Sequence, residues 1–157
     1  MRIHLDTTYL LPLIGIRVKE ISSEDFDKLL EKEFKLYINQ ISIFELCAKG
    51  AKYIAKGLLS MERVIRGVNA IVYGEEFKKV PFNETKVMEL SFKVRKLLTD
   101  YVDCIILSSA ITNCEVLVTE DEDILMLRKN RELLRILEEV NPDFKILPLK
   151  DFIASST

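Results

Sequence analysis

The chemistry in this 157-residue sequence lies with a few acidic side chains that stand near the ends of apolar runs. Asp6 ends the first such run, Glu45 lies in the first turn of the helix expected after the second, and Asp121 follows a third. Asp103, at the start of an apolar helical segment, completes the set. Ligands of open parallel sheets bind beyond the carboxyl ends of the strands. We therefore expect these carboxylates to converge on one edge of a sheet.

Carboxylates gathered in this way need a partner of opposite charge. At about 5 Å and an effective dielectric of about 20, each pair would repel by several kcal/mol. A cation must relieve that repulsion, or some of the acids must be protonated. All-oxygen ligation favours hard ions such as Mg²⁺ or Mn²⁺. Zinc is not expected, because the chain has one histidine and no Cys-x-x-Cys pair.

Each acid could also have a purely structural role. Ser42 and Glu45 have the spacing of a capping box, and Asp100 and Asp103 resemble one. Asp6 stands where it could cap the helix that follows it. The last acids belong to a charged run that is typical of a solvated loop capping the next helix. Four unrelated caps nevertheless have no reason to follow one sequence order.

Apolar periodicity predicts the elements that position these acids. We expect short strands at residues 2–6, 36–38, 77–82, 115–119 and 145–149. We expect helices after residue 6, over about ten residues from 23, and at 42–57, 61–73, 84–98 (capped by Asn83), 104–110 and 123–140. This alternation implies an α/β fold of three layers, α/β/α, around a central parallel sheet of about four to five short strands. No linker or repeat interrupts residues 1–157, which predicts a single domain.

Several side chains are expected in the core. In the helix at 42–57 and just after it, the apolar residues at helical spacing are Phe44, Cys47, Ala51, Ile54 and Leu58. The three cysteines, each flanked by apolar residues, are typical of buried free thiols. His4, alone on its strand, is more typical of a packed core residue than of a catalytic one.

Composition and charge limit the location and the partners. The apolar runs are far shorter than the roughly 20 residues of a membrane helix. The carboxylate at position 6 interrupts any secretory signal. We therefore expect a cytoplasmic protein without membrane contact. The formal net charge is −2, so any nucleic-acid contact must depend on local cationic clusters.

The segments that carry the acids resemble, in their order, the four motifs of PIN-domain ribonucleases. They are Ile-His-Leu-Asp-Thr-Thr at 3–8, Ile-Ser-Ile-Phe-Glu-Leu at 41–46, the stretch 103–110, and Leu-Val-Thr-Glu-Asp-Glu-Asp at 117–123. The resemblance covers nearly the whole chain, the closing strand at 146–149 included. Asn113 stands where a glycine commonly ends the third-motif helix, and Ile124 where a phenylalanine commonly follows the last Asp. Asn tolerates the left-handed conformation of a helix C-cap.

This resemblance implies roles for individual residues. The catalytic and metal-binding quartet is Asp6, Glu45, Asp103 and Asp121, with Asp123 as a fifth metal ligand and Thr8 and Thr119 at the pocket wall. We expect Asp6 and Asp103 to be the principal ligands. Glu45 and Asp121 would bind a second ion or orient the attacking water.

The resemblance also implies an activity and partners. The expected activity is Mg²⁺- or Mn²⁺-dependent hydrolysis of phosphodiester bonds in single-stranded RNA, either in RNA processing or as the toxin of a toxin–antitoxin pair, with an antitoxin protein as partner. A homodimer is also implied. The candidate interface lies on the helices at 61–73 and 84–98, because their apolar residues could exceed what one sheet face covers; the alternative is that all of them belong to the core of the chain. These residues are Val64, Val68, Ile71, Val87, Leu90 and Val94.

A lysine stripe leads away from the predicted acidic pocket. Lys49, Lys52 and Lys56 follow Glu45 at offsets that fall within about 40° of its direction on a helix. We expect this stripe to guide the RNA backbone. The alternative is a solvated helix face with one Glu45–Lys49 pair worth a few tenths of a kcal/mol.

Two other functions remain open from the sequence. An aspartyl-phosphate phosphohydrolase also begins with an Asp at a strand end. It normally needs a second acid two residues later, where this chain has Thr8, and it gives Glu45 no role. The second is a PIN-like binding module that has kept the fold but has little activity, as in RNA processing or ribosome assembly.

Overall fold

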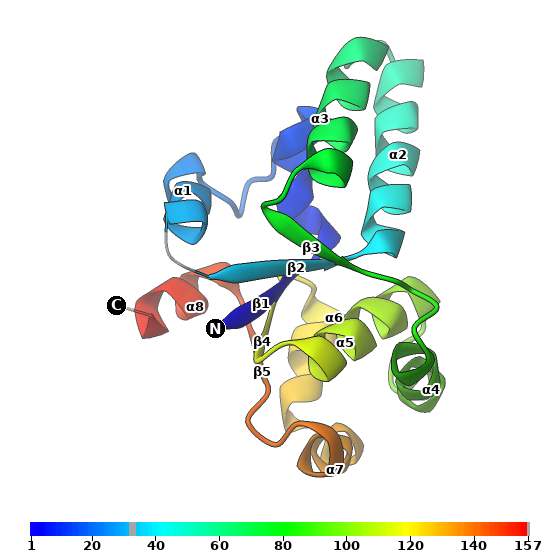
Figure 1. The fold of residues 1–157 in the computed structure, drawn as a ribbon, viewed down its shortest axis with the longest axis vertical. Coiled ribbons are helices and arrows are strands. Elements are labelled where there is room, and N and C mark those ends of the chain that lie inside the picture. The colour runs from blue at the N-terminus through cyan, green and yellow to red at the C-terminus, as the bar shows by residue number, and fades with distance from the viewer. Residues whose placement is uncertain (32–33, 157) are drawn as a thin grey trace.

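The computed structural model describes residues 1–31 and 34–156, and a five-stranded parallel sheet lies at its centre (Figure 1). The strands are β1 (Arg2–Leu5), β2 (Lys35–Asn39), β3 (Phe77–Val80), β4 (Val116–Val118) and β5 (Lys145–Leu147). Their order in the sheet is β3-β2-β1-β4-β5. Ile3 of β1 pairs with Leu36 of β2 on one side and with Val116 of β4 on the other. The chain therefore starts in mid-sheet, builds outward to β3 and then crosses to β4.

Helices cover both faces of the sheet, which confirms the predicted α/β/α layers (Figure 1). One face carries the 3-10 helix η1 (Thr7–Ile14) and helices α1 (Ser23–Glu31), α2 (Gln40–Ala55), α3 (Met61–Tyr73) and α8 (Leu149–Ser155). The other carries α4 (Thr85–Val94), α5 (Tyr101–Asn113), α6 (Glu122–Met126), the 3-10 helix η2 (Leu127–Lys129) and α7 (Arg131–Val140). Within the described ranges, no helix is long and apolar enough to cross a membrane.

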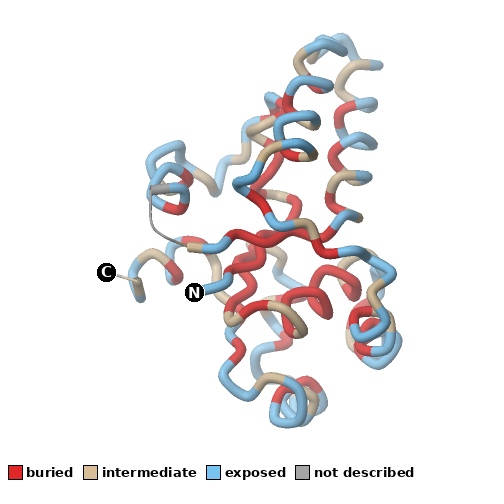
Figure 2. Tube along the Cα trace, in the orientation of Figure 1, coloured by how far each residue is buried: buried red, intermediate tan, exposed pale blue. Residues whose placement is uncertain are grey.

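Each face of the sheet has its own apolar core. Successive side chains of a strand point to opposite faces. Ile3 and Leu5 join the core shared with η1 and α2, whereas Leu117 and Ile146 join the core shared with α5 and α7. The buried residues accordingly follow the strands and α5 through the middle of the molecule (Figure 2). Cover on both faces explains why the strands are apolar runs in the sequence.

His4 is a core residue, as expected. Its Nε2 atom lies 3.2 Å from the Ser109 hydroxyl of α5. Burial lowers the pKa of His4 to about 3, so the ring is neutral near pH 7. A buried neutral imidazole facing α5 helps to join that helix to the sheet.

The hairpin formed by α2 and α3 extends away from the sheet and rests on η1 (Figure 1). A Cβ atom at Gly67 would lie 2.3 Å from the backbone oxygen of Leu13, so α3 can approach η1 this closely only with glycine there. Arg63 donates to the same oxygen over 2.6 Å. Gly15, at φ 95°, ends η1 in the left-handed conformation. These contacts anchor the hairpin to the rest of the fold.

The prediction of one long helix at 123–140 is wrong, because the structure has three shorter helices there, α6, η2 and α7. Asn130 interrupts it: its side chain accepts the N–H groups of Glu132 and Leu133 over 2.9 and 3.0 Å and so caps α7. The short helix α8 was not predicted from the sequence. Pro148 directly precedes α8 and has no backbone N–H to donate to the sheet, and β5 ends at Leu147, two residues earlier than expected.

Two predicted caps are also wrong. Glu84 precedes α4 without a side-chain hydrogen bond, and Asn83 does not cap that helix. Asn113 does not adopt the left-handed conformation: it is the last residue of α5, and Cys114 follows with an extended backbone. The Asn113 amide instead donates to the Ser109 carbonyl over 3.1 Å. The end of α5 therefore continues straight into β4 and needs no glycine.

The predicted core face of α2 is wrong. The helix buries Ser42, Leu46 and Gly50. Of the residues expected inside, Ile54 is half-buried, whereas Phe44, Cys47, Ala51 and Leu58 are exposed. Cys104 and Cys114 are buried, as predicted. Helical spacing identifies an apolar stripe, but it does not show whether the same chain covers it.

The side chains predicted for a dimer interface lie inside the chain. Val68 is partly buried against the core, and the other members of that set, Val64, Ile71, Val87, Leu90 and Val94, are buried. The prediction of a helix at 84–98 is also too long, because α4 ends at Val94. Helix α3 uses its residues to pack on α2 and η1, and α4 packs on α5. None of them is free to pair with a second copy.

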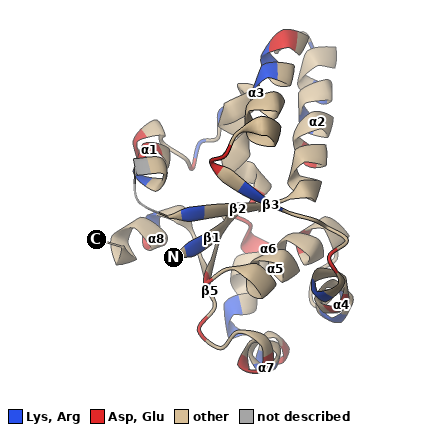
Figure 3. Cartoon of the chain, viewed as in Figure 1, with Lys and Arg blue, Asp and Glu red and all other residues tan. Residues whose placement is uncertain are grey.

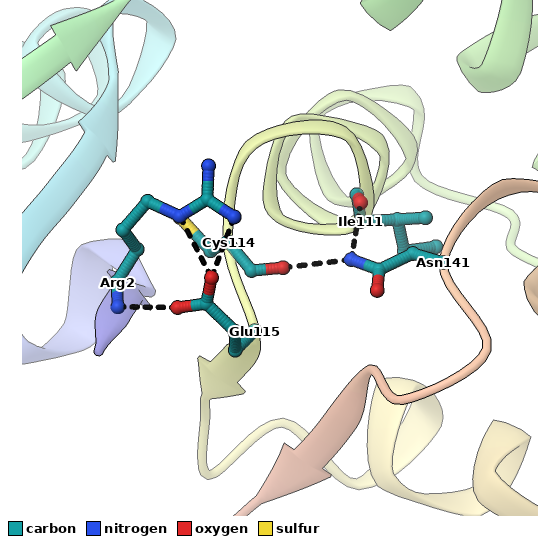
Figure 4. A network of polar contacts seen from close by, with 5 residues as sticks. All are labelled: Arg2, Ile111, Cys114, Glu115 and Asn141. Carbon is teal, nitrogen blue, oxygen red and sulfur yellow. Dashed lines mark hydrogen bonds and ion pairs between the residues drawn. The ribbon is translucent and has the colours of Figure 1, made fainter.

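A polar network fixes the amino edge of the sheet, opposite the predicted site (Figure 4). The Arg2 guanidinium donates to the Glu115 carboxylate over 2.5 Å. The Asn141 amide donates to the carbonyls of Ile111 and Cys114 over 2.9 and 2.8 Å. Carbonyls at the end of a helix have no partner within that helix. Asn141, in the turn that follows α7, therefore supplies hydrogen bonds to carbonyls at the end of α5.

Replacing Asn141 by alanine should lower the free energy of unfolding by about 1–2 kcal/mol, because two partly buried carbonyls lose their donor. Arg2→Ala is the matched comparison. Its ion pair is exposed, with 50% and 40% of the two side chains accessible, so its loss should cost less than about 1 kcal/mol. Urea unfolding followed by circular dichroism measures both. A larger loss for Arg2→Ala than for Asn141→Ala would contradict this account.

Candidate active site

The predicted acids gather around the carboxyl ends of β1 and β4. Asp6 follows β1 and Asp121 lies three residues after β4, and these two strands are neighbours in the sheet. The chain leaves β1 toward one edge and reaches β4 on the other side, so the gap between them is the switch point where open α/β sheets bind ligands. Glu45 reaches this place from α2 and Asp103 from α5, on opposite faces of the sheet.

Asp6 is fixed by one hydrogen bond to each carboxylate oxygen. The Thr7 N–H donates to Oδ1 over 2.6 Å, and the Thr119 hydroxyl donates to Oδ2 over 2.7 Å. Asp6 thereby caps η1, as its purely structural role predicts. It is nevertheless buried, with only 7% of its surface exposed. Burial raises its pKa to about 6 against the effect of the two hydrogen bonds, and the charges of Glu45 and Asp121 raise it further.

Glu45 is held from across the sheet edge by Thr7. The Thr7 hydroxyl donates to the Glu45 carboxylate and lies 2.9 Å from the Ser42 hydroxyl. Ser42 and Glu45 do not form a capping box, because Asn39 caps α2 by accepting the N–H of Ile41 over 2.9 Å. Burial raises the pKa of Glu45, and the Thr7 hydrogen bond opposes that shift.

Asp103 is the acid with the freest carboxylate. It is half-buried in the first turn of α5, and no residue in the described ranges donates a hydrogen bond to it. Asp100 caps α5 in its place by accepting a backbone N–H over 2.8 Å. Burial raises the pKa of Asp103 to about 7, and the charges of Asp121, Asp100, Asp6 and Glu45 add to this shift in that order. Asp103 therefore lies within electrostatic reach of the three other predicted acids.

Asp121 caps a helix and also acts on the other acids, whereas Asp123 lies apart from them. The Asp121 carboxylate accepts the N–H of Ile124 over 2.9 Å and caps α6, while its own N–H donates to the Thr119 hydroxyl over 3.0 Å. Thr119 therefore connects Asp6 with Asp121, which agrees with its predicted place at the pocket wall. Asp123 is exposed on the first turn of α6. The charges that raise the pKa of the buried acids include that of Asp121 and not that of Asp123.

Two residues near the acids were missed by the sequence reasoning. Thr7, rather than Thr8, contacts the acids; Thr8 is half-buried, and its hydroxyl bonds to no residue in the part of the chain that the structure describes. Asp100 adds its charge to both Glu45 and Asp103. The sequence signal for Thr7 was its place directly after Asp6, at the point where the strand turns into a helix.

The donor chemistry of this group fits a hard divalent cation. All the donors are carboxylate oxygens, and their mutual repulsion is the effect that a bound cation would relieve. The oriented Asp6 and the free Asp103 are the side chains best suited to hold an ion. Among residues 1–31 and 34–156, no three His, Cys, Asp or Glu side chains lie close enough to chelate one ion as they stand. An ion would therefore have to draw the carboxylates together.

The predicted lysine stripe is exposed along α2. Lys49 is near enough to the site for its charge to lower the pKa of Glu45. Lys52 lies in the last turn of α2, and Lys56 follows as the residue at its C-cap. The stripe therefore begins beside the acids and leads away from the sheet, although only its first member acts on them.

The fold and the acids define a class: doubly wound α/β proteins with a carboxylate site at the switch point of a parallel sheet. The sequence model of the PIN domain matches residues 3–130. The chain belongs to the PIN domain family, whose members are generally nucleases. The predicted resemblance is thereby confirmed.

Two solved structures share this fold. A chain of VapBC2 from Rickettsia felis, bound to a DNA fragment from its promoter, aligns with a TM-score of 0.55 and 18% identity over 94% of this chain and 98% of that one. A chain of DNA-bound VapBC from Salmonella typhimurium aligns with a TM-score of 0.54 and 21% identity over 95% of this chain and 98% of that one. No curated protein sequence matches the chain.

The pKa of Asp6 makes a prediction about stability in metal-free buffer. Its pKa rises from 3.8 to about 6 on folding, so the folded protein binds this proton more tightly than the unfolded chain. Protonated Asp6 therefore adds to the free energy of unfolding below pH 3.8, and this contribution is lost as the pH rises to about 6 and above. A shift of about two units corresponds to roughly 3 kcal/mol at most. Asp6→Asn removes this penalty and keeps an oxygen to cap η1.

Urea unfolding of the wild type and Asp6→Asn in EDTA should therefore give a difference that grows with pH. We expect Asp6→Asn to gain stability relative to the wild type between about pH 4 and about pH 7 and to be the more stable protein at the upper end. A difference that stays constant with pH, or that favours the wild type more at high pH, would show that Asp6 is not destabilised by its surroundings.

Proposed function

We propose that this chain is a metal-dependent endoribonuclease that hydrolyses phosphodiester bonds of single-stranded RNA. One observation carries the proposal: Asp6, Glu45, Asp103 and Asp121 meet at the switch point, and burial and mutual charge raise the pKa of Asp6 and Asp103 toward neutrality. Carboxylates destabilised in this way gain from positive charge placed among them, which a divalent cation would supply at neutral pH. The PIN domain match and the oxygen-only donors support the same reading.

The side chains divide the work by how they are held. Two acids would bind the ion: Asp6, oriented by Thr7 and Thr119, and Asp103, which accepts no hydrogen bond from residues 1–31 or 34–156. Mg²⁺ or Mn²⁺, when bound, would supply an activated water and neutralise the charge that develops on the phosphoryl oxygens. Glu45 and Asp121 would hold a second ion or orient the water. Asp123 would contribute less, because it is exposed and apart from the others.

The proposed partners are an antitoxin protein and a second copy of this chain. An antitoxin is supported by the two VapBC complexes that share this fold. The structure offers a surface for it in the exposed apolar stripe of α2, which includes Phe44, Cys47 and Ala51 and continues to Leu58. A monomer leaves this stripe in water, and contiguous exposed apolar residues mark interaction sites. The homodimer rests on the family resemblance alone.

A PIN-like binding module with little activity is the second candidate. It is favoured by one observation, that no three ligand side chains in the described ranges are preassembled around an ion site. The aspartyl-phosphate phosphohydrolase has no such support. It leaves Glu45 without a role, although Thr7 holds that residue in the acid group.

Cleavage of a fluorescent single-stranded RNA separates these candidates. The wild type should cleave with Mg²⁺ or Mn²⁺ and lose all activity in excess EDTA. Asp6→Asn and Asp103→Asn should each reduce kcat/KM by at least about 100-fold while far-UV circular dichroism stays unchanged, because each removes a principal metal ligand.

Asp123→Asn is the matched control, since it removes the same charge from the same edge of the sheet. We expect it to lose less than about tenfold. Equal cleavage in EDTA and in Mg²⁺ would reject the metal mechanism. Absence of cleavage by the pure wild type under every metal condition would favour the binding module.

A further inference from the structure

A cationic hollow lies between α2 and the segment that joins η1 to α1. Its volume is about 400 Å³. Its lining includes the cations Arg17, Lys19, Lys49 and Lys52 and one acid, Glu20. Lys and Arg positions are spread over helices on both faces of the sheet (Figure 3), and the net charge of the chain is −2. Four cations around one hollow are therefore a local concentration of positive charge.

The cations of the hollow are exposed to solvent. Arg17 and Lys19 lie in the loop after η1, and Lys49 and Lys52 lie on the facing side of α2. No ion pair within 4.0 Å joins any of them to a residue in the described part of the chain. Like charges around one hollow repel each other, and an anion placed between them would relieve that repulsion. The hollow is therefore suited to a negatively charged ligand.

The floor of the hollow is apolar and aromatic. Leu11, Ile16, Val18 and Tyr53 line it together with the cations. Small inorganic anions gain nothing from such a floor. A nucleotide has both parts, because its phosphate would meet the cations while its base or ribose would cover the apolar side chains. The lining therefore favours a nucleotide over a free anion.

Lys49 connects the hollow with the acid group. It lies four residues after Glu45 on α2, so the two side chains are neighbours on the helix surface. The charge of Lys49 reaches the Glu45 carboxylate. Lys56, the last member of the predicted lysine stripe, does not line the hollow. The cationic path thus turns from α2 toward Arg17 and Lys19 and does not follow the helix to its end.

We propose that this hollow binds the phosphate backbone of the RNA strand beside the scissile bond, with Arg17 and Lys19 as new contacts opposite Lys49 and Lys52. The proposal rests on the proposed function, since it takes the strand to leave the acidic site past Glu45. The hollow would thus be a binding subsite for the strand that is separate from the acids of the cleavage site.

Binding measured without cleavage tests the hollow by itself. In an Asp6→Asn background with Mg²⁺, fluorescence anisotropy follows a labelled uridine oligonucleotide of about eight nucleotides. Adding Arg17→Gln and Lys19→Gln should weaken binding and flatten the slope of log K against log salt by roughly 0.7 for each lost contact, hence roughly 1.4. Glu20→Gln, which removes the acid of the hollow, should strengthen binding.

The control is Lys35→Gln with Lys145→Gln, which changes the total charge equally at the amino edge of the sheet, where both residues are exposed. We expect this pair to leave the slope unchanged. Equal slopes in the hollow and control variants, or polyglutamate competing as well as RNA at equal charge, would overturn the proposal. If the wild type does not cleave RNA but the hollow variants and the control give the expected salt slopes, the proposed nuclease activity is rejected and RNA binding by the hollow is not.

Discussion

The central constraint on this structure is that carboxylates are partly buried, and near enough to act on one another, at the switch point of a parallel sheet. Asp6 and Asp103 are held in surroundings that raise their pKa to about 6 and about 7. A fold accepts such a penalty only if it holds the acids rigidly. Here Asp6 and Asp121 cap η1 and α6, and Glu45 and Asp103 lie on α2 and α5. Two threonines, Thr7 and Thr119, orient the acids from within the sheet edge.

The capping and chemical explanations of the acids turn out to be compatible. Asp6 caps η1 and Asp121 caps α6, yet both act on the charge of the other acids. A cap directs one carboxylate oxygen at backbone N–H groups and fixes the side chain. The second oxygen of Asp6 is held by Thr119. Capping thus supplies the rigidity that a metal site needs. At α5 the tasks are separate, since Asp100 caps the helix and leaves Asp103 free.

Most of the fold and the acid group could be predicted from the sequence, because each depends on local patterns. Apolar runs that end on Asp6 and before Asp121 mark the strands and the site together. The core face of α2 could not be predicted, since periodicity gives a stripe and not what covers it. Phe44 is 69% exposed on a hairpin that leaves the sheet. The hollow at Arg17 could not be predicted either, because it depends on a loop packing beside a distant helix.

The most direct test of this account is the pKa of Asp103, measured by ¹³C NMR titration of its side-chain carboxyl in metal-free protein. We expect a value near 7 that falls in Asp121→Asn, because the charge of Asp121 is the largest of those acting on it. Mg²⁺ should lower the value in the wild type as well. An ordinary pKa near 3.8 that Asp121→Asn leaves unchanged would show that the acids do not converge, and would contradict the account.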